Sequence, residues 1–269
     1  MINLNRMLEA AGPIPLGAMP IEIAMEAMLT HRLQAGFSGN YPLHTAPSDN
    51  YKLEKGDDGW MNYGLSLEPA VGSGYNACSH KTPGCEDSCV AHAGNGNYPS
   101  AKRGRIFKTR FLAANPLAFC TVLDHEITRA ERKAERVGAK LADRLNAFAD
   151  LRWENICPAL FRRHPDVQFY DYTKWPSNHR HTPSNYHLTY SYSGERPNRH
   201  YMEDDNVAVV FDTPRGHPLP VSFLGRAVID GDQDDARYHD EIGVVVGLRA
   251  KGKAVKDTTG FVVSAEGAS

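Results

Sequence analysis

The fold is decided by strand-like stretches such as Val167-Gln168-Phe169-Tyr170-Asp171-Tyr172. Aromatic and β-branched residues favour a pleated backbone, and apolar runs without strict alternation are typical of strands that are buried on both faces. Working outward, the same pattern recurs in six other stretches, at residues 63–67, 140–148, 186–192, 207–211, 227–229 and 243–248. These stretches predict an α/β protein rich in parallel strands.

Two helices are predicted between the first two of these strands in chain order. One is expected from about Ser100 to Ala114, and Asn115 with Pro116 then caps a second helix that ends near Gly138. A helical connection between neighbouring strands is the signature of a βαβ unit. The predicted fold is therefore a partial or complete (β/α) barrel, with a mixed open sheet as the alternative.

The first sixty residues differ from the rest of the chain. Pro13, Pro15 and Pro20 interrupt any early helix, residues 21–33 predict a short amphipathic helix, and residues 36–58 are rich in Gly, Pro, Asn and Asp. We therefore predict an N-terminal extension, a short helix plus a loop, over residues 1–59. The barrel-like catalytic domain is expected over residues 60–269.

Composition excludes several classes of protein. The chain has 269 residues, with 30 Lys and Arg against 32 Asp and Glu, so its formal net charge is −2. That balance argues against a polybasic protein. No apolar run reaches the roughly 18 residues of a membrane helix, and the first residues lack the layout of a secretion signal. We expect a cytoplasmic protein that does not enter a membrane.

Three of the five cysteines lie close together in the chain. Cys78, Cys85 and Cys89 form a C-x6-C-x3-C pattern, with a Pro-Gly turn between the first two. Clustered thiols in a reducing compartment more often hold a metal than form disulfides. Three cysteines without an obvious fourth suit a [4Fe–4S] cluster with one iron open to substrate or S-adenosylmethionine. A closed zinc site, the alternative, would recruit His80 or His92 as its fourth ligand.

The two remaining cysteines are isolated in the sequence. Cys120 lies beside Phe119 in a predicted helix and is expected to be a small buried residue. Cys157 follows a predicted strand and could approach the metal site, although isolated cysteines are usually structural. Whether Cys157 supplies a fourth ligand stays open.

Polar residues recur where the predicted strands end. Parallel strands bring their carboxyl ends to one face, so these residues are expected to form a ring there. Asp171 with Lys174, among aromatic residues, suits a nucleobase or nucleotide substrate. Single acids at strand ends also commonly serve turns, and that alternative stays open for each of them. The candidate residues are Asn146, Asp150 and Glu154 for cofactor binding, and Asp171, Lys174, Asp230 and Asp232 for catalysis.

Several motifs resemble the phage-encoded "gene product eighty-eight" domain family. The resemblance covers roughly residues 62–263 and implies a protein of a phage-infected or prophage-carrying bacterial host. The residues that carry it are Gly64-Leu65-Ser66-Leu67, Gly74-Tyr75-Asn76-Ala77-Cys78, Thr82-Pro83-Gly84-Cys85 with Cys89, Lys108-Thr109-Arg110, Arg144-Leu145-Asn146 with Asp150 and Trp153-Glu154, Val167 to Lys174, Asn185 to Thr189, Asp230-Gly231-Asp232 and Gly247 to Gly252.

A more distant likeness concerns the radical S-adenosylmethionine barrels. The order of strand, cysteine loop, helix and polar-ended strand is similar to the start of such a barrel, which implies an iron–sulfur cluster on Cys78, Cys85 and Cys89. Asn146 and Asp150 then occupy the place of the segment that binds the cofactor's methionine end. The chain departs from that family in its C-x6-C-x3-C spacing, where C-x3-C-x2-C is usual, and in the lack of a GGE-type segment.

These observations lead to three functional hypotheses. The first is an iron–sulfur enzyme of radical S-adenosylmethionine type that acts on a nucleotide or nucleic acid. The second is a zinc-stapled barrel with carboxylate chemistry, such as a base-exchange transglycosylase with Asp171 as nucleophile. The third is a non-catalytic nucleic-acid-binding accessory protein, suggested by the basic and aromatic residues of the stretch 174–200.

Overall fold

A computed structural model describes residues 1–37, 41–47, 59–70, 72–194 and 205–267. Most of the predicted loop at 36–58 and part of the basic stretch 174–200 lie outside these residues. The helices are α1 (Leu4–Ala10), α2 (Ile21–Gln34), α4 (Pro83–Asp87), α5 (Pro99–Ala114), α6 (Pro116–Arg136), α7 (Trp153–Ile156) and α8 (Pro158–Arg163). Short 3-10 helices are η2 (Val90–His92), η3 (Gly94–Asn97), η4 (Ser177–His179), η6 (Arg237–His239), η7 (Gly252–Lys256) and η8 (Ala265–Gly267).

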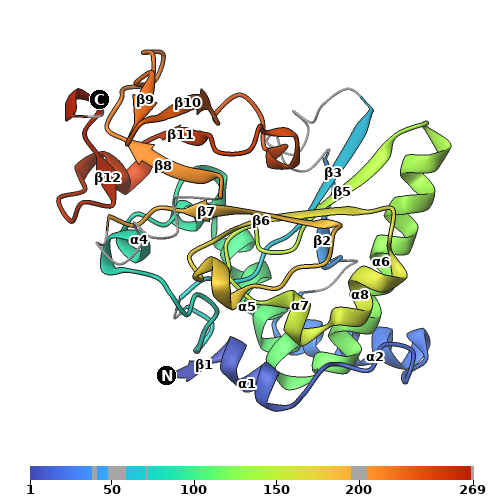
Figure 1. The fold of residues 1–269 in the computed structure, drawn as a ribbon. Coiled ribbons are helices and arrows are strands. Elements are labelled where there is room, and N and C mark those ends of the chain that lie inside the picture. Colours follow the sequence, from blue (N-terminus) through green and yellow to red (C-terminus); the bar gives the residue numbers. More distant parts are fainter. Residues whose placement is uncertain (38–40, 48–58, 71, 195–204, 268–269) are drawn as a thin grey trace.

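The strands form one large sheet and one small sheet (Figure 1). In the large sheet the order is β2-β3-β5-β6-β7-β8-β11-β10-β9, and β12 also pairs with β8. Neighbours from β3 to β10 run parallel, whereas β2 and β9 pair antiparallel at the two edges. The strands are β1 (Ile2–Asn3), β2 (His44–Thr45), β3 (Trp60–Leu65), β4 (Tyr75–Asn76), β5 (Lys140–Arg144), β6 (Gln168–Thr173), β7 (Tyr186–Ser191), β8 (Val207–Phe211), β9 (Ser222–Phe223), β10 (Arg226–Asp230), β11 (Val245–Arg249) and β12 (Val262–Val263).

The predicted barrel is wrong, because this sheet is open. Within the described residues its edges are the short strands β2 and β9, and no ladder joins them. The segment after β10 contacts β3 and β5 through side chains. Tyr238 donates a 3.0 Å hydrogen bond to Asn62 of β3, and Arg144 of β5 lies 2.7 Å from Asp235. The sheet is therefore open, mixed and mostly parallel. Polar side chains connect the segment after β10 to β3 and β5.

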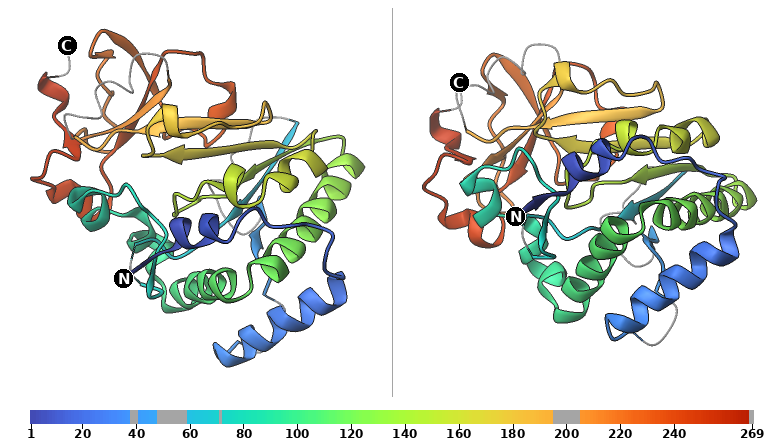
Figure 2. Two further views of the ribbon diagram at one scale, coloured as in Figure 1. Left: turned by 60° about the horizontal axis from the view of Figure 1, so that its bottom comes forward. Right: turned by 90° about the horizontal axis from the view of Figure 1, so that it is seen from below.

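Helices cover the half of the sheet that contains β3 and β5 (Figure 2). Helix α6 packs on these two strands, and α2 and α5 pack in turn on α6. As predicted, Asn115 caps α6, where its side chain accepts a hydrogen bond from the Ala118 amide at 3.2 Å and Pro116 takes the first position. The buried face of α6 contributes Phe119, Leu123 and Ile127 to the main core.

Residues of the predicted N-terminal extension share this core. Leu4 and Leu8 of α1 and Ala24 and Met28 of α2 are buried in the same hydrophobic cluster as α6. Strand β1 pairs with β4, directly before the cysteine loop. The domain division at residue 59 stays a prediction.

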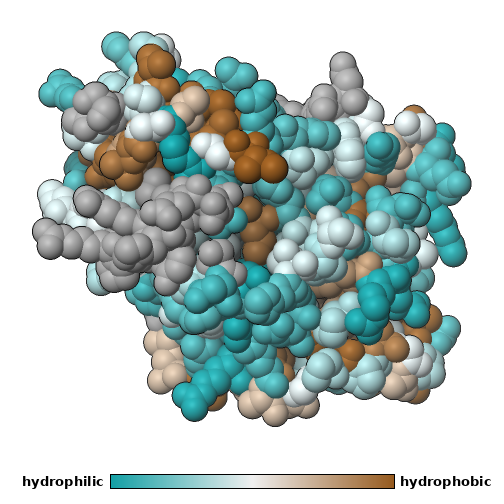
Figure 3. All heavy atoms as spheres, in the orientation of Figure 1, coloured by the Kyte–Doolittle hydropathy of each residue, from teal (hydrophilic) through white to brown (hydrophobic). Residues whose placement is uncertain are grey.

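The strands β8 to β12 lack such a helical cover in the described part of the chain (Figure 1). A smaller cluster, which includes Val207, Phe211 and Phe223, forms their core. On the face shown in Figure 3, hydrophobic atoms gather over this region, whereas most of the remaining surface is hydrophilic. Val221, beside β9, is 88% exposed. Among the described helices, none is both long enough and apolar enough to cross a membrane.

Candidate functional site

A cavity of about 600 Å³ opens at the carboxyl ends of the parallel strands. Its lining includes residues that end or follow β3, β5, β6, β7 and β11, together with the cysteine loop. Sites in open α/β sheets commonly lie at this edge, and the volume is that of a small-molecule pocket. The lining residues used below are Tyr41, Cys78, Lys81, Cys85, Cys89, Arg105, Lys108, Arg144, Asn146, Phe148, Asp150, Lys174, Ser191, Asp232, Asp235, Arg249, Lys251 and Phe261.

The cysteine loop is fastened to the loop after β5. Cys78 and Asp150 form an isolated parallel bridge, and the Asp150 amide donates a 2.9 Å hydrogen bond to the carbonyl of Ala77. Further along, Thr82 caps α4 by accepting a 3.2 Å hydrogen bond from the Cys85 amide. A Cβ on Gly84 would lie 2.0 Å from the Thr259 hydroxyl, so only glycine allows this close approach. These contacts place the cysteines of the loop against the cavity.

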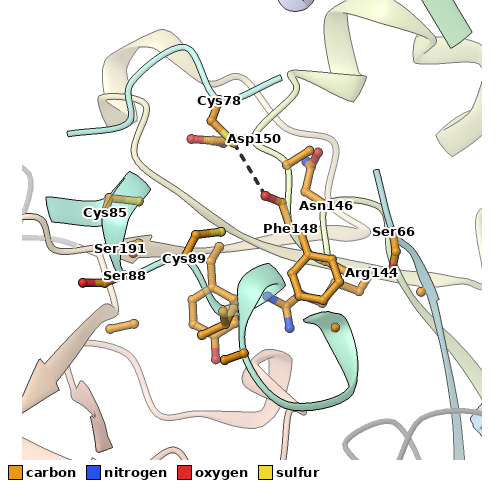
Figure 4. Close-up of a pocket in the computed structure, with 18 of the residues that line it drawn as sticks. Ser66, Cys78, Cys85, Ser88, Cys89, Arg144, Asn146, Phe148, Asp150 and Ser191 are labelled. Carbon is orange, nitrogen blue, oxygen red and sulfur yellow. Dashed lines mark hydrogen bonds between the residues drawn. The ribbon is translucent and has the colours of Figure 1, made fainter. Parts of the chain in front are cut away.

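All three clustered cysteines line the cavity (Figure 4). The Cys78 thiol donates to the carbonyl of Phe148 at 3.5 Å. Burial raises the pKa of Cys78 and of Cys89, so both are thiols in this arrangement. In the described part of the chain, no three Cys, His, Asp or Glu side chains form a group that could hold a metal ion. The cysteines thus share one cavity without forming a ready-made site for a single ion.

The three candidates for a fourth metal ligand, His80, His92 and Cys157, do not line the cavity. The His80 ring packs on Trp175 with centroids 4.1 Å apart, and burial lowers its pKa. Neither His80 nor His92 is among the residues that line the cavity. Cys157 is buried in the main core next to Cys120, which matches the structural reading of these two cysteines. Cys78, Cys85 and Cys89 therefore line the cavity, whereas none of these three candidates does.

Asp171 lies behind the cavity wall. The Asn146 amide N–H donates to its carboxylate at 2.7 Å, the Asn146 side chain at 3.1 Å, and the Tyr186 hydroxyl at 2.7 Å. Burial raises the pKa of Asp171 to about 7. Asp171 does not line the cavity, whereas Asn146 does. Asp171 thus holds Asn146 and the loop after β5 in position.

Asp150 and Glu154 share one arginine. Arg180 donates to Glu154 at 2.5 and 3.0 Å and lies 3.6 Å from Asp150. Asp150 also accepts from the Thr173 hydroxyl and the Lys174 amide, both at 2.8 Å. Burial raises the pKa of Asp150, although Arg180 opposes that shift. Of the predicted cofactor-binding residues, Asn146 and Asp150 line the cavity and Glu154 does not.

The predicted pair Asp230 and Asp232 lies in an ion-pair network. Arg249 contacts Asp230 at 2.8 Å and Asp232 at 3.1 Å, and Lys251 contacts Asp232 at 2.5 Å. Hydrogen bonds to Arg249 lower the pKa of Asp230, so this carboxylate is ionised. Asp232 lines the cavity and Asp230 does not.

Arg144 and Asp235 form an ion pair on the cavity wall, and neither was among the predicted site residues. Arg144 lines the cavity, pairs with Asp235 at 2.7 Å and lies over the Tyr172 ring with its guanidinium carbon 4.7 Å from the centroid. Arg144 is the last residue of β5, so the strand-end rule that selected Asn146 could have found it. Asp235 comes from the loop after β10, and its contact with β5 has no signal in the sequence.

The comparisons with known proteins identify a family but no function. No curated protein matches the chain, and no solved structure matches it. The likeness to radical S-adenosylmethionine barrels therefore gains no support from either comparison. The family model described as Gene product 88 matches residues 37–265, which cover most of the chain and all of the cavity described above. The chain belongs to the Gene product 88 family of phage proteins.

Proposed function

We propose that this protein is an enzyme whose cavity binds a small, nucleotide-like substrate beside an iron–sulfur cluster held by Cys78, Cys85 and Cys89. One observation carries the proposal: three cysteines from a single short loop line the same cavity as the polar residues at the strand ends. Substrate-binding residues in α/β folds are commonly placed at this edge of the sheet. The cavity of about 600 Å³ suits a nucleotide-sized molecule better than a nucleic-acid strand.

The arrangement of the thiols supports a cluster more than a closed zinc site. A structural zinc ion needs four ligands around one point, and His80, His92 and Cys157 all lie outside the lining. The thiolates of a [4Fe–4S] cluster each bind a different iron, so they stand further apart than the ligands of a single ion. With three cysteines, one iron is left to bind substrate or S-adenosylmethionine.

The strand-end residues would hold the substrate next to this centre. Asp150 is fixed by Thr173, the Lys174 amide and Arg180, so its carboxylate is a preorganised acceptor for a hydroxyl or amino group. Phe148 and Phe261 add apolar surface to the lining. Asp171, which lies behind the wall, is not suited to act as a nucleophile, so the transglycosylase hypothesis is not carried forward.

Anaerobic reconstitution tests this proposal. Purified protein incubated with iron and sulfide should turn brown and retain about four iron and four sulfide per chain. Cys85→Ala should lose the colour, whereas Cys120→Ala, which removes a core cysteine outside the lining, should keep it. Circular dichroism should show that both variants are folded. A colourless zinc protein, or a Cys85→Ala variant that keeps its cluster, would overturn the proposal.

A further inference from the structure

The cations that line the cavity are almost all neutralised by carboxylates. Each arginine has an acidic partner within ion-pair distance, and so do two of the lysines. An ion pair of this kind has little net charge left to attract a ligand. The pairs are Arg105 with Glu68 at 2.8 Å, Arg144 with Asp235 at 2.7 Å, Arg249 with Asp230 at 2.8 Å, Lys251 with Asp232 at 2.5 Å, and Lys81 with Glu86.

Two lining lysines, Lys108 and Lys174, have no carboxylate partner within ion-pair distance among the described residues. Lys108 is almost fully buried and donates to the carbonyl of Leu43 at 2.8 Å. Burial lowers its pKa to about 8. Its buried ammonium group is thus already used to tie the segment before β2 to α5. Lys174 is only partly buried, and among the described residues it lines the cavity without an ion-pair partner, while its charge helps to oppose the rise in the pKa of Asp150.

Lys174 forms a pair with a hydroxyl group. Its ammonium donates to the hydroxyl of Ser191 at 2.6 Å and to the Ser191 carbonyl at 3.2 Å. It also lies 5.4 Å from the centroid of the Phe261 ring. Both Lys174 and Ser191 line the cavity. None of these partners carries a negative charge.

The topology places this pair at an opening between strands. Lys174 follows β6, and Ser191 ends β7. The pairing of β7 with β8 ends at Ser191, and from Val210 onward β8 pairs with β12 instead. Lys174 and Ser191 therefore lie beside the cavity, near the point along β8 where its pairing changes from β7 to β12.

The hydrogen-bonding capacity of the pair is only partly used. An ammonium group has three N–H donors, and the two contacts to Ser191 occupy two of them. The serine hydroxyl accepts from Lys174 and still has its own proton to donate. One N–H and one O–H are thus left next to each other on the cavity wall. Two adjacent donors with a net positive charge match the oxygens of a phosphate or carboxylate group.

We propose that Lys174 and Ser191 form the subsite for an oxyanion of the substrate, a phosphate or a carboxylate. The proposal rests on the cavity being the substrate site, as argued above, but not on the presence of a metal. The bound anion would neutralise Lys174, which has no ion-pair partner among the described residues, and it would accept hydrogen bonds from both side chains. Lys174 and Ser191 would thereby fix the anionic end of the substrate at the β7 side of the cavity.

Calorimetric titration of the metal-free full-length protein tests the subsite. Inorganic pyrophosphate and succinate serve as the phosphoryl and carboxylate probes, and the tighter of the two identifies the class of anion. Lys174→Met should weaken binding of that probe about tenfold or more, because a charge-assisted hydrogen bond is lost. Ser191→Ala, which keeps the cation, should weaken it about threefold. Lys253→Met, an exposed lysine outside the lining, makes the same change in net charge and should bind as the wild type does.

The outcomes separate this inference from the proposed function. Wild-type protein that binds neither probe, or a folded Lys174→Met variant with unchanged affinity, would overturn the subsite. An equal loss in Lys253→Met would show a general charge effect and would overturn it as well. Wild-type protein that takes up no cluster yet binds pyrophosphate through Lys174 would refute the proposed metal centre alone. Cluster uptake without binding of either anion would refute the subsite alone.

Discussion

The two halves of the sheet are stabilised by different means. The helix-covered half, β3 to β7 with its helices, buries a large apolar cluster around Phe119 and Trp153. The other half, β8 to β12, which we call the charge-paired half, has only a small cluster, so the contacts of its arginines contribute relatively more to its stability. Arg226 donates to the carbonyls of Gly243 at 2.7 Å and Asp205 at 2.5 Å, and Arg249 pairs with Asp230, which ends β10, and with Asp232. One mostly parallel sheet thus combines a half with a large apolar core and a half with a small one, and residues of both halves line the cavity.

The largest expected effect distinguishes the two cores. Phe119→Ala should lower the free energy of unfolding by about 4–5 kcal/mol, because Phe119 is fully buried between Phe111 and Trp153 and its removal leaves a cavity. Phe211→Ala should cost about 3 kcal/mol, because Phe211 belongs to a smaller cluster of apolar side chains. Urea unfolding measures both. An equal or larger loss for Phe211→Ala would show that the two cores are equally rigid.

An intermediate effect on the free energy of unfolding is expected for the ion pairs of His164 in the helix-covered half. Although burial lowers the pKa of His164, the hydrogen bonds that its ring donates to Asp124 at 3.1 Å and to Glu131 at 2.7 Å raise it to about 9. The protonated form therefore stabilises the fold below pH 6.5, the ordinary value, and this contribution is lost as the pH rises from 6.5 through about 9.

Comparison of His164→Gln with the wild type isolates this contribution. The difference in unfolding free energy should be on the order of 1 kcal/mol at pH 6 and should vanish by about pH 10. Thermal melts across this pH range measure it. A difference that does not change with pH would show that His164 acts through packing alone.

The smallest expected effect on the free energy of unfolding is that of Arg249 in the charge-paired half. Arg249→Met should lower the unfolding free energy by about 1 kcal/mol or less, because the partly exposed pair with Asp230 is screened by water. Raising the salt concentration should reduce the difference further. Melts at low and high salt test this, with the exposed Lys253→Met as the control. A salt-independent loss would mean that the contacts of Arg249 with the His217 carbonyl, at 2.8 Å, are the important ones.

Local patterns in the sequence predicted the strands and helices well. The predicted strand at 207–211 has the bounds of β8, and the predicted strand at 186–192 extends one residue beyond β7. Aromatic and β-branched runs decide these elements through local backbone preference, as Asn115 and Pro116 decide the start of α6. The order of the strands was not predictable in this way. β11 inserts between β8 and β10, and the two-residue edge strands β2 and β9 are too short to show any periodicity.

The site was predicted in part. The strand-end rule brought Asn146, Asp150, Lys174 and Asp232 to one cavity together with the three cysteines. The same rule was misleading for Asp171, because its side chain points to Asn146 and Tyr186 and not to the cavity. Which way a strand-end side chain turns depends on partners far away in the chain. Asp235, which reaches Arg144 across the open sheet, is another case that local patterns cannot show.

The pairing of β12 with β8 has a consequence for how the site forms during folding. The lining of the cavity extends from Tyr41 to Phe261, so its outer members are separated by 261 − 41 = 220 positions in the chain. Contacts of such long range form slowly, because most of the chain must be ordered before they can close. Phe261 reaches Lys174 only when the segment leading into β12 has docked. The capacity to bind an anion should therefore appear last in refolding, after the helix-covered half has already folded.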